Sequence, residues 1–169
     1  TLKGLNVTIP YKEEIIPYLD NLDQQARIIG AVNTIKFLED GTLVGYNTDH
    51  YGFRKSLASY PTPKSKTALI LGDGGASKAI KFALDGLGYC CTTVSRGKTK
   101  DTITYDQVTK QVLGNNTLIV NTTPLGVAPD VLKCPDIPYS CITKEHFLFD
   151  LIYNPGQTTF LKHGLANGA

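Results

Sequence analysis

Apolar residues along the chain first alternate with polar ones and then, after a proline-rich connector, form continuous runs. In the first section, residues 5–9 predict a short strand that leads into Pro10. The ten residues after that proline have helical apolar spacing, with Pro17 expected to kink or interrupt the helix. Residues 22–30 predict a second short helix, because the apolar pattern stops there at a glycine.

A hairpin and a further helix complete the first section. Residues 31–46 alternate on both sides of Asp40-Gly41, a dipeptide that is typical of a β-hairpin. Residues 47–60 then predict a helix, for which Thr48 or Asp49 is the natural cap.

The connector PTPKSK is the best domain boundary in the chain. Beyond it, a continuous apolar strand at Ala68–Leu71 runs into a glycine-rich turn, and further strands alternate with helical patterns. Such alternation predicts a parallel sheet with right-handed crossovers. We therefore predict an α/β protein, in which residues 1–60 form part of an N-terminal α/β domain. Residues 61–169 are expected to form a second domain that ends in the start of a C-terminal helix.

Composition excludes several classes of protein. Hydrophobic residues make up 41% and charged residues 19%, which is enough to form an ordered core. The formal net charge of +2, with both signs mixed along the chain, argues against a nucleic-acid or membrane surface. No apolar run approaches the ~20 residues of a membrane span, and no signal-peptide pattern is present, so we expect a cytoplasmic protein.

The four cysteines do not have the spacing of a metal site. Cys90 and Cys91 are adjacent, and neither Cys134 nor Cys141 forms a second close pair or has a histidine at ligand spacing. We expect reduced, buried thiols and no metal.

The segment GDGGASKA follows a predicted strand and opens a predicted helix. Gly72 permits a tight turn, Gly74 lets the backbone approach a pyrophosphate, and Gly75 or Ala79 permits close packing of helix and strand. A merely structural turn is the alternative, since glycine-rich turns are common. The strand–turn–helix context favours dinucleotide binding.

The ribose preference of such a site is expected at the end of the next strand, about 20 residues further on. Ser95, Arg96 and Lys98 lie there, without an Asp or Glu to bind a ribose 2′-hydroxyl. The two cations suit a 2′-phosphate. We therefore predict a Rossmann-type domain that binds NADP(H).

Lys12 lies where a carboxylate would be preferred, at the N-terminus of the first predicted helix. Asp49 taken alone is explained as a helix cap. The two strand-end loops that carry these residues are expected to converge at one edge of a sheet, where they would form a proton relay beside a carbonyl. Thr8 and Asn33 lie at similar turns and are candidates to orient a hydroxylated substrate, although Asn33 equally suits a strand-end hydrogen bond.

Seven motifs resemble those of the shikimate dehydrogenase family, in the family's order and over nearly the whole chain. They are NVTIPYK, IGAVNTI, GYNTDHYGF, GDGGASKA, SRGKTK, NTTPLG and DLIYNPGQTTFL. The resemblance implies NADPH-dependent reduction of 3-dehydroshikimate to shikimate, in chorismate and aromatic amino-acid biosynthesis. It also implies that residues 1–60 belong to the substrate domain.

The resemblance implies a role for each matching residue. Lys12 and Asp49 would be the catalytic pair. Thr8, Asn33 and Tyr153 would contact the substrate. The cofactor would be bound by Gly72, Asp73, Gly74, Gly75, Ala76, Ser95, Arg96, Lys98 and Leu151, with Leu151 near the nicotinamide. A homodimer is a candidate assembly.

The chain departs from the family pattern in two places. Ser95 and Gly97 replace an Asn and a Thr, so we expect the 2′-phosphate to be held less tightly. The family's paired serines, which grip the substrate carboxylate, and its C-terminal helices have no counterpart in the 169 residues. We expect the chain alone to turn over poorly, because substrate positioning would be lost.

Two other functions remain open at this point. A quinate/shikimate dehydrogenase that uses NAD would be favoured by an acidic residue at positions 95–98, and there is none. A non-catalytic NADP-binding module would need neither Lys12 nor Asp49, so the presence of both favours the enzyme.

Overall fold

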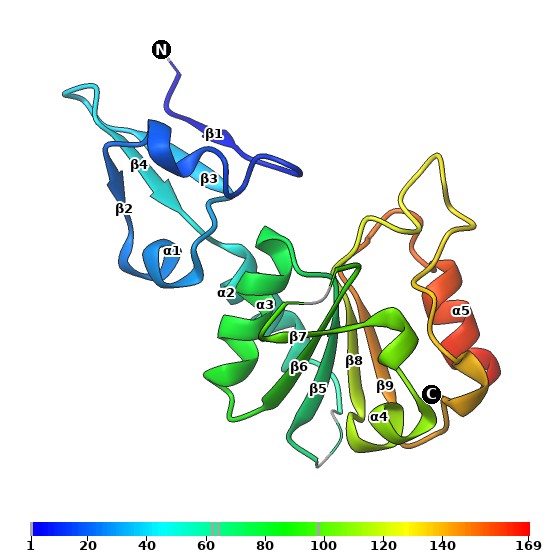
Figure 1. The fold of residues 1–169 in the computed structure, drawn as a ribbon. Helices are drawn as coiled ribbons and strands as arrows, with labels where there is room; N and C mark the ends of the chain where they lie inside the picture. The colour runs from blue at the N-terminus through cyan, green and yellow to red at the C-terminus, as the bar shows by residue number, and fades with distance from the viewer. Residues whose placement is uncertain (1, 62, 64, 98) are drawn as a thin grey trace.

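The computed structural model describes residues 2–61, 63, 65–97 and 99–169, which form two sheets with helices α2 and α3 between them (Figure 1). The smaller sheet has the order β1-β3-β4-β2. Its strands are β1 (Gly4–Asn6), β2 (Asn21–Leu22), β3 (Thr34–Phe37) and β4 (Leu43–Tyr46). Strand β3 is antiparallel to β1 and β4, and β2 is parallel to β4.

The predicted hairpin and second helix are confirmed. Strands β3 and β4 pair from Phe37↔Leu43 to Thr34↔Tyr46, around a loop in which Gly41 has a φ of 90°. Helix α1 (Gln24–Ile29) begins at Asp23, whose side chain accepts the Gln25 N–H, and ends at Gly30.

The strand and helix predicted around Lys12 are only partly correct. Strand β1 already ends at Asn6, and the next residues form turns followed by a short 3₁₀ helix, η1 (Ile16–Tyr18). Pro17 has no N–H to donate, so an α-helix that began near Tyr11 would end after about one turn. Lys12 therefore lies in a turn, and the expectation that it opposes a helix dipole is wrong.

The larger sheet confirms the predicted parallel fold. Its strand order is β7-β6-β5-β8-β9, and every pair is parallel. Its strands are β5 (Thr67–Leu71), β6 (Cys90–Ser95), β7 (Thr102–Thr104), β8 (Leu118–Asn121) and β9 (Phe147–Asp150). Strand β7 was not predicted, because three residues are too short for a recognisable pattern.

Helices cover both faces of this sheet. They are α2 (Asp49–Leu57), α3 (Gly75–Asp85), α4 (Lys110–Asn115) and α5 (Thr159–Ala166), with two 3₁₀ helices, η2 (Tyr105–Gln107) and η3 (Tyr139–Cys141). Ala68 and Ile70 of β5 pack toward α2 and α3, and the alternate residues Leu69 and Leu71 pack toward α4 and α5. The helix predicted over residues 105–114 is therefore divided into η2 and α4, whereas the helix at the C-terminus is confirmed.

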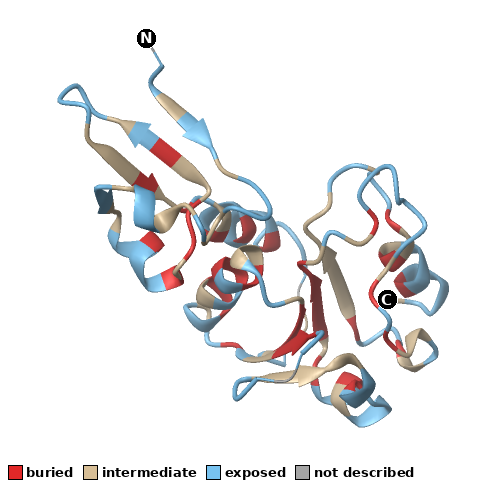
Figure 2. Ribbon diagram, turned by 45° about the horizontal axis from the view of Figure 1, so that its top comes forward, coloured by how far each residue is buried: buried red, intermediate tan, exposed pale blue. Residues whose placement is uncertain are grey.

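Burial is concentrated in the larger sheet (Figure 2). Helix α2 contributes Phe53 and Leu57 to the core of this sheet, although it precedes the connector. The division of the chain at residue 60 stays a prediction. Ile29 and Ala31 pack against Ala79 of α3, which joins the smaller sheet's half of the molecule to the larger one.

The four cysteines are free, and they are less buried than expected. Cys90 is exposed and the other three are half-buried. No helix in the described part of the chain is long and apolar enough to cross a membrane.

Candidate active site

Three of the predicted polar residues lie close together at one edge of the smaller sheet, where strands β1 and β4 end and β3 begins. Because β3 is antiparallel to both neighbours, the carboxyl ends of β1 and β4 lie at the same edge as the start of β3. Thr8 follows β1, Asn33 precedes β3, and Asp49 follows β4. The Val7 N–H donates to the Asn33 carbonyl at 2.8 Å, which joins two of these segments.

Lys12 and Asp49 form an ion pair at this edge. The distance from Lys12 Nζ to Asp49 Oδ2 is 2.8 Å, with side-chain exposures of 14% and 30%. The Lys12 carbonyl accepts the Val32 N–H at 2.7 Å, which holds the turn against the start of β3. The expected convergence of the two loops is therefore present in the structure.

Asn33 fixes the orientation of the Asp49 carboxylate. Its Nδ2 donates to Asp49 Oδ1 at 2.8 Å and to Thr48 Oγ1 at 2.9 Å, and its Oδ1 accepts the Thr48 N–H at 2.9 Å. Each oxygen of Asp49 thus has its own partner, Asn33 on one and Lys12 on the other.

Asp49 is the first residue of α2 and does not cap it. Thr48 occupies the N-cap position, and no side-chain capping bond is made there among the described residues. The carboxylate is used in the contacts with Lys12 and Asn33 instead. The sequence analysis did not assign Thr48 to the site, although its position next to Asp49 at a strand end was a usable signal.

Thr8 and Tyr153 lie at the surface. The Thr8 side chain is exposed, and only its backbone carbonyl is engaged, by the Tyr11 N–H. Tyr153 is 91% exposed and makes no side-chain hydrogen bond with the described residues. The structure therefore does not bring the Tyr153 side chain into contact with the Lys12–Asp49 pair.

The glycine-rich turn has the shape that a bound phosphate requires. Gly72 has a φ of 110°, and a Cβ there would stand 2.7 Å from Thr122 Oγ1. Gly74 is the N-cap of α3, without a side-chain capping bond among the described residues, and the space beside its Cα is open. The first N–H groups of α3 are thus left for a ligand. Asp73 is exposed and Ala76 is half-buried.

The turn also lies at the point where the strand order reverses. Strand β5 pairs with β6 on one side and β8 on the other, and ligands of open α/β sheets bind at the carboxyl ends of such strands. Thr122, which follows β8, donates its hydroxyl to the Leu71 carbonyl at 2.7 Å. The ends of β5 and β8 are therefore joined beneath the turn.

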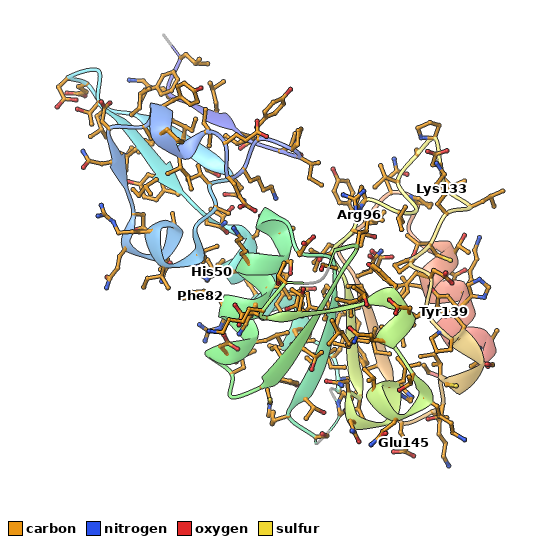
Figure 3. All side chains as sticks on the ribbon, in the orientation of Figure 1. His50, Phe82, Arg96, Lys133, Tyr139 and Glu145 are labelled. Carbon is orange, nitrogen blue, oxygen red and sulfur yellow. The ribbon has the colours of Figure 1, made fainter. Side chains whose placement is uncertain are left out.

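Among the described residues, the loop after β6 carries one cationic side chain, that of Arg96. Arg96 is exposed and extends from the same edge of the sheet as the glycine-rich turn (Figure 3). Ser95 is only 1% exposed, and its hydroxyl donates to the Gly97 carbonyl and lies 3.0 Å from Thr102 Oγ1. The Ser95 hydroxyl therefore holds the loop. Lys98 lies outside the described residues.

Tyr105 was missed by the sequence analysis. Burial, with the Asp73 carboxylate as a smaller cause, raises the pKa of its phenol to about 12, and Arg96 opposes the shift. The charges of Asp73 and Arg96 therefore both act on the Tyr105 phenol. Its place after a short unpredicted strand gave no earlier signal.

Asp150 organises the loop that carries Leu151. It accepts hydrogen bonds from Thr158 Oγ1 at 2.6 Å, the Ile152 N–H at 3.0 Å and Asn121 Nδ2 at 3.1 Å. Burial nevertheless raises the pKa of this carboxyl. Leu151 is half-buried, and its N–H donates to the Asn121 carbonyl at 3.1 Å, next to the end of β8.

The ion pair and the glycine-rich turn are in contact. A Cβ on Gly75 would stand 2.9 Å from the Lys12 Cβ and 3.2 Å from the Ala31 Cβ. Only a glycine leaves room for Lys12 at this point. The Lys12–Asp49 ion pair of one sheet therefore lies directly beside the glycine-rich turn of the other.

Comparisons with known proteins show what the chain is similar to in sequence and in fold. Residues 1–35 match the model of the shikimate dehydrogenase substrate binding domain. The NADP⁺ shikimate dehydrogenase of Methanosphaera stadtmanae is 40% identical over 99% of the chain and 65% of that relative's length.

Two solved structures have the same fold. The crystal structure of shikimate dehydrogenase from Aquifex aeolicus has a TM-score of 0.85 and 40% identity, over 99% of this chain and 64% of that one. The Thermus thermophilus enzyme, in complex with NADP(H) and shikimate, has a TM-score of 0.85 and 33% identity, over 99% and 65%. The chain thus spans a little under two thirds of the length of these relatives. By sequence and by fold, the chain is similar to shikimate dehydrogenases along nearly its whole length.

Proposed function

We propose that the protein reduces 3-dehydroshikimate to shikimate with NADPH. The observation that carries the proposal is the Lys12–Asp49 ion pair of 2.8 Å, set against Gly75 of the glycine-rich turn. A protein that only bound a dinucleotide would have no use for an oriented acid–base pair beside the phosphate turn.

The residues of the larger sheet fit the cofactor. The open space at Gly74 and the uncapped start of α3 suit the pyrophosphate, and Arg96 suits a 2′-phosphate. Asp73, Gly72 and Ala76 complete the turn, and we propose that Leu151 lies near the nicotinamide. When bound, NADPH supplies the hydride that the carbonyl carbon accepts.

The chain's own residues handle the proton. The Lys12 ammonium stabilises negative charge that develops on the carbonyl oxygen, and the Lys12–Asp49 pair supplies the proton that completes the hydroxyl. Asn33 holds the Asp49 carboxylate in place through Oδ1, which leaves Oδ2 for Lys12. We propose that Thr8, Asn33 and Tyr153 orient the substrate hydroxyls.

The test is NADP⁺ reduction by the purified protein with shikimate and, separately, with quinate. NADPH formation that depends on shikimate and far exceeds that with quinate supports the proposal. A preference for quinate, or for NAD⁺, would favour a quinate/shikimate dehydrogenase. Slow but shikimate-dependent turnover is the result expected of this chain alone, whereas NADP⁺ binding with no NADPH formation even at high protein concentration would favour a non-catalytic NADP-binding module.

The proposal also covers the location of the protein and its assembly. We propose that the protein acts in the cytoplasm and that a homodimer is the assembly to test. Sedimentation of the purified protein over a range of concentrations distinguishes a monomer from a dimer.

A further inference from the structure

A second ion pair joins the two halves of the molecule next to Lys12. Glu13 follows Lys12 in the turn, and its carboxylate accepts from the Lys78 ammonium of α3. The two side chains are 41% and 43% exposed. Lys78 lies in the first turn of α3, and its N–H donates to the Gly74 carbonyl at 3.1 Å.

The ion pair lies near an apolar contact between α3 and another segment of the smaller sheet's half, residues 29–31. Ala79, the next residue of α3, packs with Ile29 and Ala31, and Gly75 leaves room for Lys12. The turn that carries Lys12 is thus held from two sides. The Val32 N–H holds it to the smaller sheet, and Lys78 holds it to the helix that begins at the phosphate turn.

We infer that Glu13 and Lys78 are positioning residues, which set the Lys12 ammonium relative to the glycine-rich turn. This inference rests on the proposed function for its catalytic consequence. Among the hydrogen bonds of the described residues, the two side chains bind each other and neither binds Lys12 Nζ or the Asp49 carboxylate. Both act through the backbone of the turn, because Glu13 is the neighbour of Lys12.

The pair matters for geometry more than for stability. Exposed ion pairs contribute little to the stability of a fold. By contrast, a displacement of ~1 Å in a reacting group costs as much as 100-fold in rate. A weak contact therefore has a measurable effect when it controls the position of a catalytic side chain.

A direct contact between Lys78 and the cofactor phosphates is the competing explanation, and charge reversal separates the two. In the positioning model, Glu13→Gln and Lys78→Met each lower kcat about tenfold, and the reversed pair Glu13→Lys/Lys78→Glu restores most of it. In the phosphate model, Glu13→Gln has no effect and the reversed pair is worse than Lys78→Met, with a raised KM for NADP⁺.

Lys81 and Asp85 provide a matched control. They form an ion pair of 2.8 Å on the same helix, with exposures of 48% and 49%, and both residues belong to α3. Lys81→Met is expected to leave kcat and both KM values unchanged. A loss as large as that of Lys78→Met would overturn the inference.

Amide hydrogen exchange tests whether the Glu13–Lys78 pair couples the Lys12 turn to α3, and it does so without relying on turnover. Each single variant is expected to increase exchange about two- to fivefold in both segments, residues 9–16 and 72–79. The double variant Glu13→Gln/Lys78→Met is expected to show no further increase. Changes confined to the mutated segment, or additive changes, would refute the positioning role.

If the wild-type protein does not oxidise shikimate, the proposed function alone fails, and the exchange data still decide the coupling.

Discussion

The two sheets of this protein differ in how they are buried and in what they carry. All four residues of β8 are buried, as are four of the five in β5, whereas β3 and β4 each bury one residue of four. Helices cover the larger sheet on both faces, as a parallel sheet requires. The smaller sheet carries the Lys12–Asp49 pair at its edge. Most of the core thus lies in the larger sheet, whereas Lys12 and Asn33, which hold the Asp49 carboxylate, come from the smaller sheet's half of the molecule.

The largest effect is expected from removing the acid–base group. Lys12→Ala should lower shikimate-dependent kcat by about 100- to 10,000-fold, because the proton and the charge stabilisation are both lost. NADP⁺ affinity, measured by fluorescence titration, should stay within about twofold, since the larger sheet is intact. Lys55→Ala, at an exposed position of α2, is the control. Full activity of the Lys12 variant would remove the basis for assigning chemistry to the smaller sheet.

Core truncations compare the two sheets directly. Leu69 of β5 is 0% exposed, so Leu69→Ala should lower the free energy of unfolding by about 2–5 kcal/mol. Leu43 of β4 is only half-buried, so Leu43→Ala should cost about 1 kcal/mol. Urea unfolding followed by circular dichroism measures both. Equal losses would mean that the smaller sheet contributes more packing than its burial indicates.

The contact between the sheets is tested by adding one methyl group. Gly75→Ala places a Cβ 2.9 Å from the Lys12 Cβ, so it should destabilise the fold by about 1–3 kcal/mol and also reduce kcat. Gly52→Ala in α2 meets no atom within 4 Å and should be neutral or stabilising by up to about 1 kcal/mol. Thermal unfolding of the two variants gives the comparison. If Gly75→Ala left the thermal stability unchanged, the turn that carries Lys12 would be able to move aside at little cost in free energy.

The smallest effect is a pH dependence at the junction of the halves. His50 is 6% exposed and lies edge-on to Phe82 of α3, with ring centroids 5.3 Å apart (Figure 3). Burial lowers its pKa from 6.5, as does Arg54, while Asp23 and Asp49 oppose the shift. The unfolded chain therefore binds a proton that the native protein excludes.

The stability that neutral His50 contributes is fully present above pH 6.5. It is lost as the pH falls from that value through the lower pKa of His50 in the native protein. Urea midpoints measured between pH 7.5 and 5 should decrease in the wild type, and His50→Gln should reduce the slope. Identical slopes in the two proteins would assign the effect to other groups.

Much of the larger sheet could be predicted from the sequence, because continuous apolar runs such as Ala68–Leu71 specify buried strands regardless of context. The convergence of Lys12 and Asp49 was also predictable, since strand order brings their loops to one edge. The helix expected around Lys12 does not form, because Pro17 has no backbone N–H to donate. The apolar spacing of the segment does not compensate for that lost hydrogen bond. Periodicity showed that α2 has an apolar face, but it did not show which sheet that face would cover.

Side-chain orientation accounts for most of what was missed in the site. The double contact of Asn33 with Thr48 and Asp49, and the inward hydroxyl of Ser95, depend on the paths of loops that have no periodic signal. Tyr105 is distant in sequence from Asp73 and Arg96, and only the folded chain makes them neighbours. The roles of these residues remain predictions for the experiments above.

Helix α2 belongs to both halves of the molecule. Its first residue, Asp49, completes the ion pair with Lys12, and its later residues Phe53 and Leu57 are embedded in the core of the larger sheet. Lys12 is bound to the smaller sheet through Val32, and its turn is also bound to α3 through Glu13 and Lys78. A rotation of one half against the other, about the link at residues 47–48, would therefore have to break the Glu13–Lys78 ion pair and to strain the contacts of Asp49 with Lys12 and Asn33.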